Sequence, residues 1–241
     1  MINPKFLSIQ GSYKILELSL YQNHKSLETI TLSNKKASSA LIPLIEELLA
    51  KHSITLSDLD FIGVDQGPGA FTSLRVTITT VNGISFAKKI PLIGIDGLKA
   101  LSQENLKVLN RDHKEIKPNF LVSSLNAFNN EVFFDIKKIE NNKLVETEFD
   151  NNYEKIDSLL EKIKTNFKDQ KILFTGNGTI LHEELILETL QDKAIILPNT
   201  IQVCSTEQIA DMALNRWNKK ENLESKLLPL YLKSQTFTVS K

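Results

Sequence analysis

Alternation of hydrophobic and polar residues at the start of the chain predicts three β-strands. Residues 5–10 form an apolar-leaning run that stops at Gly11, and residues 14–21 and 26–33 place an apolar side chain at about every second position. A two-residue period is typical of strands, and the polar stretch at residues 22–25 separates the last two runs. The N-terminal segment therefore predicts a β-meander.

The rest of the chain alternates between helical spacing and short apolar runs. Apolar residues three or four positions apart predict helices, and short apolar runs bounded by turn residues predict strands. In the first half, the pattern predicts a helix at 38–52, a turn at 55–58, a strand at 61–65, a helix at 72–88, a strand at 91–95 and a helix at 96–109. In the second half, it predicts strands at 119–125, 131–139 and 143–149, a helix at 153–167, a strand at 171–175, a helix at 179–191, a strand at 194–197 and a helix at 205–217. Asn141-Asn142 predicts a tight turn, and residues 227–233 are apolar enough to dock.

Both halves follow the same order of elements, βββαβαβα, although no residue-level repeat links them. The boundary falls in a polar, charged stretch at residues 107–117, which predicts an N-terminal lobe at 1–108 and a smaller C-terminal lobe with a tail at 109–241. A doubled βββαβαβα unit is the layout of the actin, Hsp70 and sugar-kinase class, whose ribonuclease H-like lobes hold nucleotide between them. We therefore expect an α/β, two-lobed actin-like (ASKHA) fold.

The composition favours a packed protein and excludes several kinds of site. Of the 241 residues, 41% are hydrophobic and 24% are charged, and 29 basic residues balance 29 acidic ones, so bulk charge does not predict nucleic-acid binding. Cys204 is the only cysteine, which excludes an intramolecular disulfide and a cysteine-based zinc site. No apolar run approaches the ~18 residues of a membrane span, and no signal-like N-terminus is evident, so we expect a cytosolic chain without membrane contact.

A Gly-Pro-Gly loop between a predicted strand and a predicted helix is the most informative segment. Its candidate residues for contact with a partner or a nucleotide are Gly67, Pro68, Gly69, Phe71, Thr72 and Arg75. Glycines beside a rigid proline allow close backbone approach, and a helix N-terminus favours an anion. Thr72 could cap the helix, and Arg75 could point back towards the same place. Two interpretations stay open: a structural strand-to-helix turn, or a site for an anion or a partner.

The two helices that flank this loop in sequence are candidates for partner binding. Residues 76–81 form an unbroken β-branched run, and no charge occurs between Arg75 and Lys88. A helix without a charged face is usually buried on all sides, either by its own core or by a second protein. The helix at 38–52 is amphipathic. The candidate partner-binding residues are Leu41, Ile45, Leu48, Val76, Ile78 and Val81.

Other polar motifs predict neither a catalytic residue nor a metal site. The four histidines, His24, His52, His113 and His182, are too far apart in sequence to place two ligands on one helix face. Cys204 has no neighbouring base in sequence, which favours a cysteine without a catalytic role. Gly176-Asn177-Gly178 is either a second phosphate-binding turn or a simple strand-to-helix turn.

The loop and several shorter stretches resemble the TsaB (YeaZ) family. Residues 67–75 resemble the family's Gly-Pro-Gly-Ser-Phe-Thr-Gly-Leu-Arg signature. Weaker matches follow in the same order: residues 37–43 resemble its His-Ser-Glu-x-Leu-x-Pro stretch, 90–95 its Ile-Pro-Leu-x-Gly-Val strand, 125–133 its Asp-Ala-Arg and Glu-Val-Tyr hairpin, and 229–233 its Pro-x-Tyr-Leu-Arg close. The resemblance covers nearly the whole chain and is strongest from residue 41 to residue 101.

This resemblance implies a non-catalytic scaffold subunit. Family members pair with the catalytic homologue TsaD, and together with the ATPase TsaE the complex transfers a threonylcarbamoyl group to the adenosine beside the anticodon of tRNA. By this resemblance, the chain would have no cofactor of its own, ATP and metal would belong to its partners, and tRNA would be reached indirectly through the complex. Copies of the isolated chain could also pair with each other through the same helices.

Several positions depart from the family pattern and keep an alternative open. Among them are Gln10, Ala37, Ser39, Ala70, Ser73 and Phe128, where the family has Asp, His, Glu, Ser, Gly and Arg. An aspartate at position 10 is what an actin-like ATPase would use to hold Mg²⁺-bound water. The alternative is a free-standing actin-like nucleotide-binding enzyme or ATPase that uses residues 67–75 and 176–178 as phosphate loops, and Gln10 argues against it.

Overall fold

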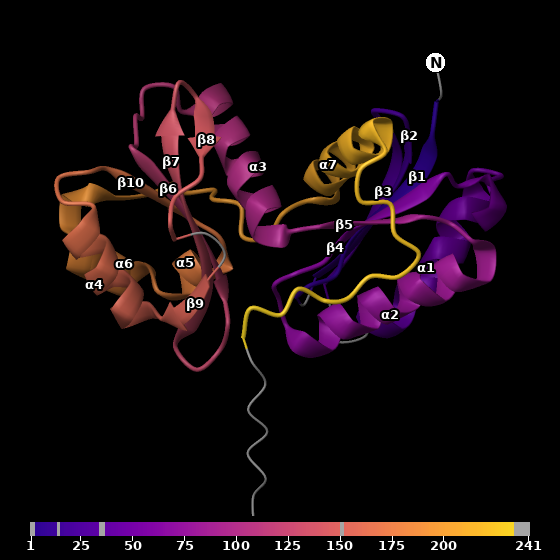
Figure 1. Cartoon of the computed structure of the whole chain (residues 1–241), viewed down its shortest axis with the longest axis horizontal. Helices are drawn as coiled ribbons and strands as arrows, with labels where there is room; N and C mark the ends of the chain where they lie inside the picture. Colours follow the sequence, from indigo (N-terminus) through magenta and orange to yellow (C-terminus); the bar gives the residue numbers. More distant parts are fainter. Residues whose placement is uncertain (1–2, 14, 34–36, 150–151, 234–241) are drawn as a thin grey trace, which may run out of the picture.

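Two α/β lobes lie side by side in the computed structural model, which describes residues 3–13, 15–33, 37–149 and 152–233 (Figure 1). The sheet of the first lobe has the strand order β3-β2-β1-β4-β5. Its strands are β1 (Lys5–Gln10), β2 (Ile15–Gln22), β3 (Lys25–Ser33), β4 (Phe61–Asp65) and β5 (Leu92–Ile95). The first three form the predicted antiparallel meander, whereas β4 and β5 continue the sheet parallel to β1. Helices α1 (Ala37–Lys51) and α2 (Phe71–Lys88) supply the crossovers that parallel strands require.

The second lobe repeats this topology, with the strand order β11-β10-β6-β7-β8. Its strands are β6 (Phe120–Asn126), β7 (Glu131–Glu140), β8 (Lys143–Val145), β10 (Ile172–Thr175) and β11 (Ala194–Ile196), and β9 (Asn152–Lys155) pairs with β7. The remaining helices are α3 (Gly97–Asp112), α4 (Ile156–Asn166), α5 (Asn177–Leu181), α6 (Glu183–Leu190) and α7 (Thr206–Lys219), with short 3-10 turns at Leu56–Asp58 and Gln191–Lys193. The expected duplication and the two-lobed α/β architecture are therefore confirmed.

The start of α4 differs from the sequence-based expectation. A helix was expected over residues 153–167, but residues 152–155 form strand β9 instead. Tyr153 lies opposite Phe133 of β7 in the strand register, and the two rings are 6.5 Å apart. Pairing with a distant strand therefore overrides the local helical pattern.

The other differences in the second lobe are small. The helix expected at residues 179–191 is divided at His182 into α5 and α6, and β8 ends at Val145. The tight turn at Asn141 and Asn142 is confirmed, because both residues have positive φ, 51° and 59°. No helix within the described ranges is long and apolar enough to cross a membrane.

The two faces of the first sheet are buried by different parts of the chain. Leu7 of β1 belongs to the core formed with α1 and α2, whereas Phe6, on the opposite face, packs in the core beneath α7. The ring of Phe6 stacks on Phe61 with centroids 4.3 Å apart, and Phe61 stacks on Trp217 of α7 at 5.0 Å. Helix α7 therefore covers the face of the sheet that α1 and α2 leave open (Figure 1).

Residues 223–233, here called the C-terminal strap, leave α7 and cross the first lobe towards the second (Figure 1). Glu224 and Leu92 of β5 exchange two backbone hydrogen bonds of 2.8 and 2.9 Å. Leu227 is fully buried in the first-lobe core, and the side-chain amide of Asn82 bonds both its N–H and its carbonyl, at 2.8 and 2.9 Å. The expected docking of the tail is therefore confirmed.

The lobes do not follow the chain continuously, which corrects the division expected at residue 108. That division assigned everything from residue 109 onward to the second lobe. Helix α7 and the strap instead return to the first lobe, because Trp217 and Leu227 find their apolar neighbours there. Helix α3 lies between the lobes and contacts both β6 and α7.

Polar groups at the end of β1 and β4 form the junction between the lobes. The Tyr13 hydroxyl donates to the carbonyl of Asn126 in β6 at 2.9 Å. Asp65, the last residue of β4, is 1% exposed and accepts a 2.8 Å hydrogen bond from the N–H of Gly67. Burial raises the pKa of Asp65 to about 6, and the nearby charge of Asp96 contributes to the same shift. The junction thus contains a carboxyl group whose ionised form is disfavoured.

We predict that Leu227→Ala destabilises the protein, whereas Leu228→Ala does not. Leu227 is fully buried, so its truncation should lower the free energy of unfolding by about 2–5 kcal/mol. Leu228 is 67% exposed, and its truncation should stay within about 0.5 kcal/mol of wild type. Urea unfolding followed by circular dichroism measures both. Equal stability of the two variants would show that the strap does not anchor the fold.

We also predict that Asp65 makes stability fall as the pH rises. Its pKa is about 6 in the folded protein against 3.8 ordinarily, so the native state binds more protons than the unfolded chain between about pH 4 and 6. Asp65→Asn keeps an acceptor for Gly67 and cannot ionise. The free energy of unfolding of the variant minus that of the wild type should therefore increase by up to about 3 kcal/mol from pH 4 to pH 7. A difference that does not change with pH would contradict this.

Candidate functional site

The Gly-Pro-Gly loop joins β4 to α2 and packs against the turn between β1 and β2. A Cβ added to Gly69 would lie 2.6 Å from both the Cβ and the carbonyl oxygen of Ser12. The N–H of Ala70 donates to that carbonyl at 2.6 Å. Gly67 has a φ of +98°, which a side chain would disfavour. Internal packing and backbone geometry thus account for both glycines, which favours the structural-turn interpretation of the loop.

Helix α2 begins without a side-chain cap. Ala70 occupies the N-cap position and makes no capping side-chain hydrogen bond, so the expected cap by Thr72 is wrong. Thr72 lies inside the first turn of the helix and is exposed. The second turn of α2 also lies close to the β1–β2 turn, because a Cβ on Gly11 would lie 2.4 Å from Oγ1 of Thr77.

Arg75 binds the C-terminal strap. Its Nε donates to the hydroxyl of Tyr231 at 2.7 Å, and its guanidinium carbon lies 3.6 Å from the centroid of the Phe71 ring. The rings of Phe71 and Tyr231 are 5.8 Å apart. Stacking of this kind and a charge-assisted hydrogen bond hold the side chain in place. The loop residues Phe71 and Arg75 are therefore brought together, and their shared contact is Tyr231.

Most of the residues expected to bind a partner through the helices are in the core. Leu41, Ile45 and Leu48 of α1 and Ile78 and Val81 of α2 are each at most 2% exposed, and they pack together against the first sheet. Val76 is half-buried. These five side chains cannot reach a partner in the folded protein. The chain's own sheet, and not a second protein, covers this face of the two helices.

Several exposed apolar residues lie on α2 and along the strap. We call this set the apolar ridge, and it consists of Phe71 and Phe86 on α2 and Leu223, Leu228 and Tyr231 on the strap. Phe86 is the most exposed of them, at 77%. Hydrogen bonds from Asn82 to Leu227 and from Ser85 to the carbonyl of Ser225 hold the strap against the helix, so the members form one surface.

A groove of about 530 Å³ lies at one end of the ridge. It is lined by Phe86, Lys89 and Pro91 on one side and by Leu223 and Lys226 on the other, among others. Helix α1 adds an exposed apolar residue of its own, since Ile42 is 53% exposed. The outer surface of the first lobe therefore combines a groove with protruding apolar side chains.

Sequence reasoning did not identify the residues that hold the strap in place. Gln66 is an example: its side-chain amide donates to the carbonyl of Leu228 at 2.6 Å, and its own carbonyl accepts from the N–H of Leu230 at 2.8 Å. Asn82 and Ser85 on α2 act in the same way. The available signal was the presence of Asn82 and Ser85, three positions apart, in the uncharged part of the helix between Arg75 and Lys88.

The second glycine loop also follows from packing. A Cβ on Gly176 would lie 2.0 Å from the carbonyl oxygen of Ser124, and one on Gly178 would lie 3.0 Å from the same residue. Asn177, between them, accepts from the N–H of Asn126 at 2.8 Å. This loop is therefore a strand-to-helix turn that packs closely against β6, in agreement with the simpler of the two interpretations.

Neither the thiol nor the histidines form a site. Cys204 is buried, and burial raises the pKa of its thiol well above its usual value, which makes it a weak nucleophile. Across the ranges that the structure describes, no group of three or more His, Cys, Asp or Glu side chains is arranged to hold a metal ion.

The fold and sequence match a known family. The model of the family TsaD, tRNA N6-adenosine threonylcarbamoyltransferase, matches residues 29–238. The tRNA threonylcarbamoyladenosine biosynthesis protein TsaB of Haemophilus influenzae is 21% identical over 98% of this chain and 96% of its own length. TsaB of Bacillus subtilis is 28% identical over 79% of this chain and 78% of its own length.

Solved structures agree on the fold. YeaZ from Pseudomonas aeruginosa superposes with a TM-score of 0.70 at 19% identity, covering 94% of this chain and 100% of that one. A second protein, described as similar to peptidase YeaZ from the same organism, reaches a TM-score of 0.74 at 20% identity, with 95% and 100% covered. Because the family model spans well over half of the residues and the TsaB relatives span nearly all of them, the chain belongs to the TsaD-related family, on its TsaB (YeaZ) branch.

Proposed function

We propose that the chain is a non-catalytic subunit of tRNA threonylcarbamoyladenosine biosynthesis that binds and supports a TsaD-like catalytic partner. The observation that carries the proposal is the apolar ridge, where Phe86 is 77% exposed on α2. Contiguous exposed apolar side chains mark surfaces that other proteins cover. The names of the relatives and of the matching family indicate the class of partner and the modification.

Two features of the ridge favour close contact with another protein. Burial of Phe86 and Leu228 would each contribute about 1.5–3 kcal/mol to association, before its entropic cost. Gly83 is exposed on the same helix, and a Cβ at this position would meet nothing within 4 Å. A glycine inside a helix costs about 1 kcal/mol relative to alanine. Its presence favours a position where a partner's backbone approaches α2 closely.

Two features of the lobe junction disfavour a Mg²⁺-bound nucleotide and so support a non-catalytic role. At position 10, the amide of Gln10 donates to Oγ of Ser12 at 2.9 Å and offers no carboxylate for Mg²⁺-bound water. The loops that would hold phosphates are packed against protein, with Gly69 on Ser12 and Gly176 on Ser124. We therefore assign ATP and metal to the partners, the TsaD-like protein and a TsaE-like ATPase.

Within this proposal, the chain acts in the cytoplasm and meets tRNA through the complex. Two copies would pair through the ridge when the partner is absent. The alternative, a free-standing actin-like ATPase, relies on residues 67–75 and 176–178 as phosphate loops. Packing accounts for the glycines of both loops, so that alternative has less support.

We predict that Phe86→Glu breaks the complex with the TsaD-like protein of the same genome and leaves the chain folded. A charge in the middle of an apolar contact should cost at least about 2 kcal/mol, or roughly a 30-fold loss of affinity. Size-exclusion chromatography with light scattering, with and without ATP, measures assembly. Circular dichroism confirms the fold of the variant.

A matched control comes from the other lobe. Leu181 of α5 is 56% exposed, so Leu181→Glu introduces the same charge on an exposed apolar site and should leave the complex intact. Charges at Ile78 or Val81 are unsuitable for this test because both residues are buried and their substitution would unfold the lobe. Survival of the complex in Phe86→Glu and in Leu228→Glu would place the interface elsewhere. A wild-type monomer that hydrolyses ATP unaided and forms no complex would favour the alternative.

A further inference from the structure

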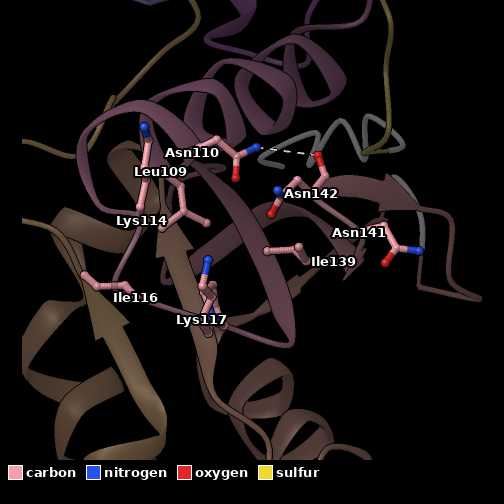
Figure 2. Close-up of a pocket in the computed structure, with 9 residues that line it drawn as sticks. Leu109, Asn110, Lys114, Ile116, Lys117, Ile139, Asn141 and Asn142 are labelled. Carbon is pink, nitrogen blue, oxygen red and sulfur yellow. Dashed lines mark hydrogen bonds between the residues drawn. The ribbon is translucent and has the colours of Figure 1, made fainter.

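A cavity of about 350 Å³ opens on the second lobe, between the end of α3, the loop after it and the β7–β8 turn (Figure 2). Its apolar part consists of Leu109, Ile116 and Ile139. The volume falls within the range typical of small-ligand sites. The ridge belongs to the first lobe, so the function proposed above makes no use of this cavity (Figure 1).

Two lysines give the cavity a positive edge. Lys114 and Lys117 line it, and Figure 2 shows the amino group of Lys117 directed towards its middle. Within the part of the chain that the structure describes, neither lysine forms an ion pair with a carboxylate. The neighbouring carboxylates have partners of their own: Asp112 pairs with Arg111 at 2.8 Å, Glu140 with Lys138 at 2.5 Å, and Glu115 lies 3.9 Å from His113. The two ammonium groups are therefore available to an anionic ligand.

Asparagine amides complete the wall of the cavity. Asn110 donates to the backbone carbonyl of Asn142 at 3.5 Å, which ties α3 to the β7–β8 turn. The side chain of Asn142 lies on the cavity side, whereas that of Asn141 points away (Figure 2). An amide offers a donor and an acceptor together, the pair of groups that the edge of a nucleobase or a ribose hydroxyl can match.

We propose that this cavity binds one nucleotide of an RNA strand, with its phosphate on Lys114 and Lys117 and its base or ribose against Asn142 and the apolar wall. An acidic peptide would match the lysines alone, whereas a nucleotide matches the lysines, the amide and the apolar surface together. The proposal rests on the role in tRNA modification. It goes beyond the indirect tRNA contact proposed above by giving this subunit, within the assembled complex, a tRNA contact of its own. Because the net charge is zero, the contact adds to the affinity of the assembled complex and does not replace the partner's own.

The test is binding of a fluorescent, unmodified tRNA transcript to the assembled complex over a range of salt concentrations. Lys114→Glu/Lys117→Glu should lower the affinity about tenfold or more and reduce the slope of log affinity against log salt by about 1.4–2, as expected for two lost phosphate contacts. Asn142→Gly removes the amide and keeps the positive φ of the turn, so it should weaken binding without changing the slope. Lys25→Glu/Lys168→Glu changes two exposed lysines elsewhere by the same charge and should have little effect.

Three outcomes would overturn the proposal. Unchanged affinity and salt slope in the Lys114/Lys117 variant would show that the cavity does not bind tRNA. An equal loss of affinity in the Lys25/Lys168 variant would show a general charge effect and no specific site. Displacement of the tRNA from this cavity by polyglutamate as efficiently as by unlabelled RNA would indicate an acidic protein ligand. Light scattering of every variant with the partner keeps the two proposals apart: a complex that assembles but shows no cavity effect refutes only this site, whereas a wild-type chain that never assembles refutes the proposed function.

Discussion

The first sheet contains parallel strands whose two faces are both apolar, and the rest of the structure depends on covering both. Parallel strands have to be buried on both sides. Helices α1 and α2 cover the face that carries Leu7, but the face with Phe6 and Phe61 would meet water without a further element. Helix α7, from the far end of the chain, covers this second face. The aromatic stack from Phe6 through Phe61 to Trp217 holds the helix in position.

The return of the chain has consequences for both lobes. To reach the first sheet, the chain leaves the second lobe after β11 and crosses beside α3, so the lobes are joined by two segments of backbone. After α7, the strap has to run along the same lobe, where Asn82 and Gln66 satisfy its backbone groups. Near its end the strap places Tyr231 against Arg75, so the first turn of α2 and the strap share one contact.

Close packing around glycines also decides which parts of the two lobes stay exposed. Glycines 11, 69 and 176 let neighbouring segments touch, because a Cβ at any of them would lie within 2.6 Å of Thr77, Ser12 or Ser124. The exposed features include the ridge on α2 and the strap and the cavity at the end of α3. A chain of this kind interacts through its outer surfaces, which agrees with a role as a subunit of a larger assembly.

The sequence by itself determined the elements, their repeated order and the family. Period-two alternation predicted β2 and β3, and short apolar runs predicted β1, β4 and β5. Turn residues predicted the Asn141-Asn142 turn, and period-3.6 spacing predicted helices at α1 and α2. These patterns do not identify what covers a buried face. Ile78 and Val81 would give the same sequence pattern whether the chain's own sheet or another protein covered them. Only the tertiary structure decided that these residues are core, that α7 belongs to the first lobe, and that Phe86 and Leu228 remain outside. These outcomes depend on contacts between residues far apart in the chain, such as Phe61 with Trp217 and Asn82 with Leu227, which no local pattern encodes.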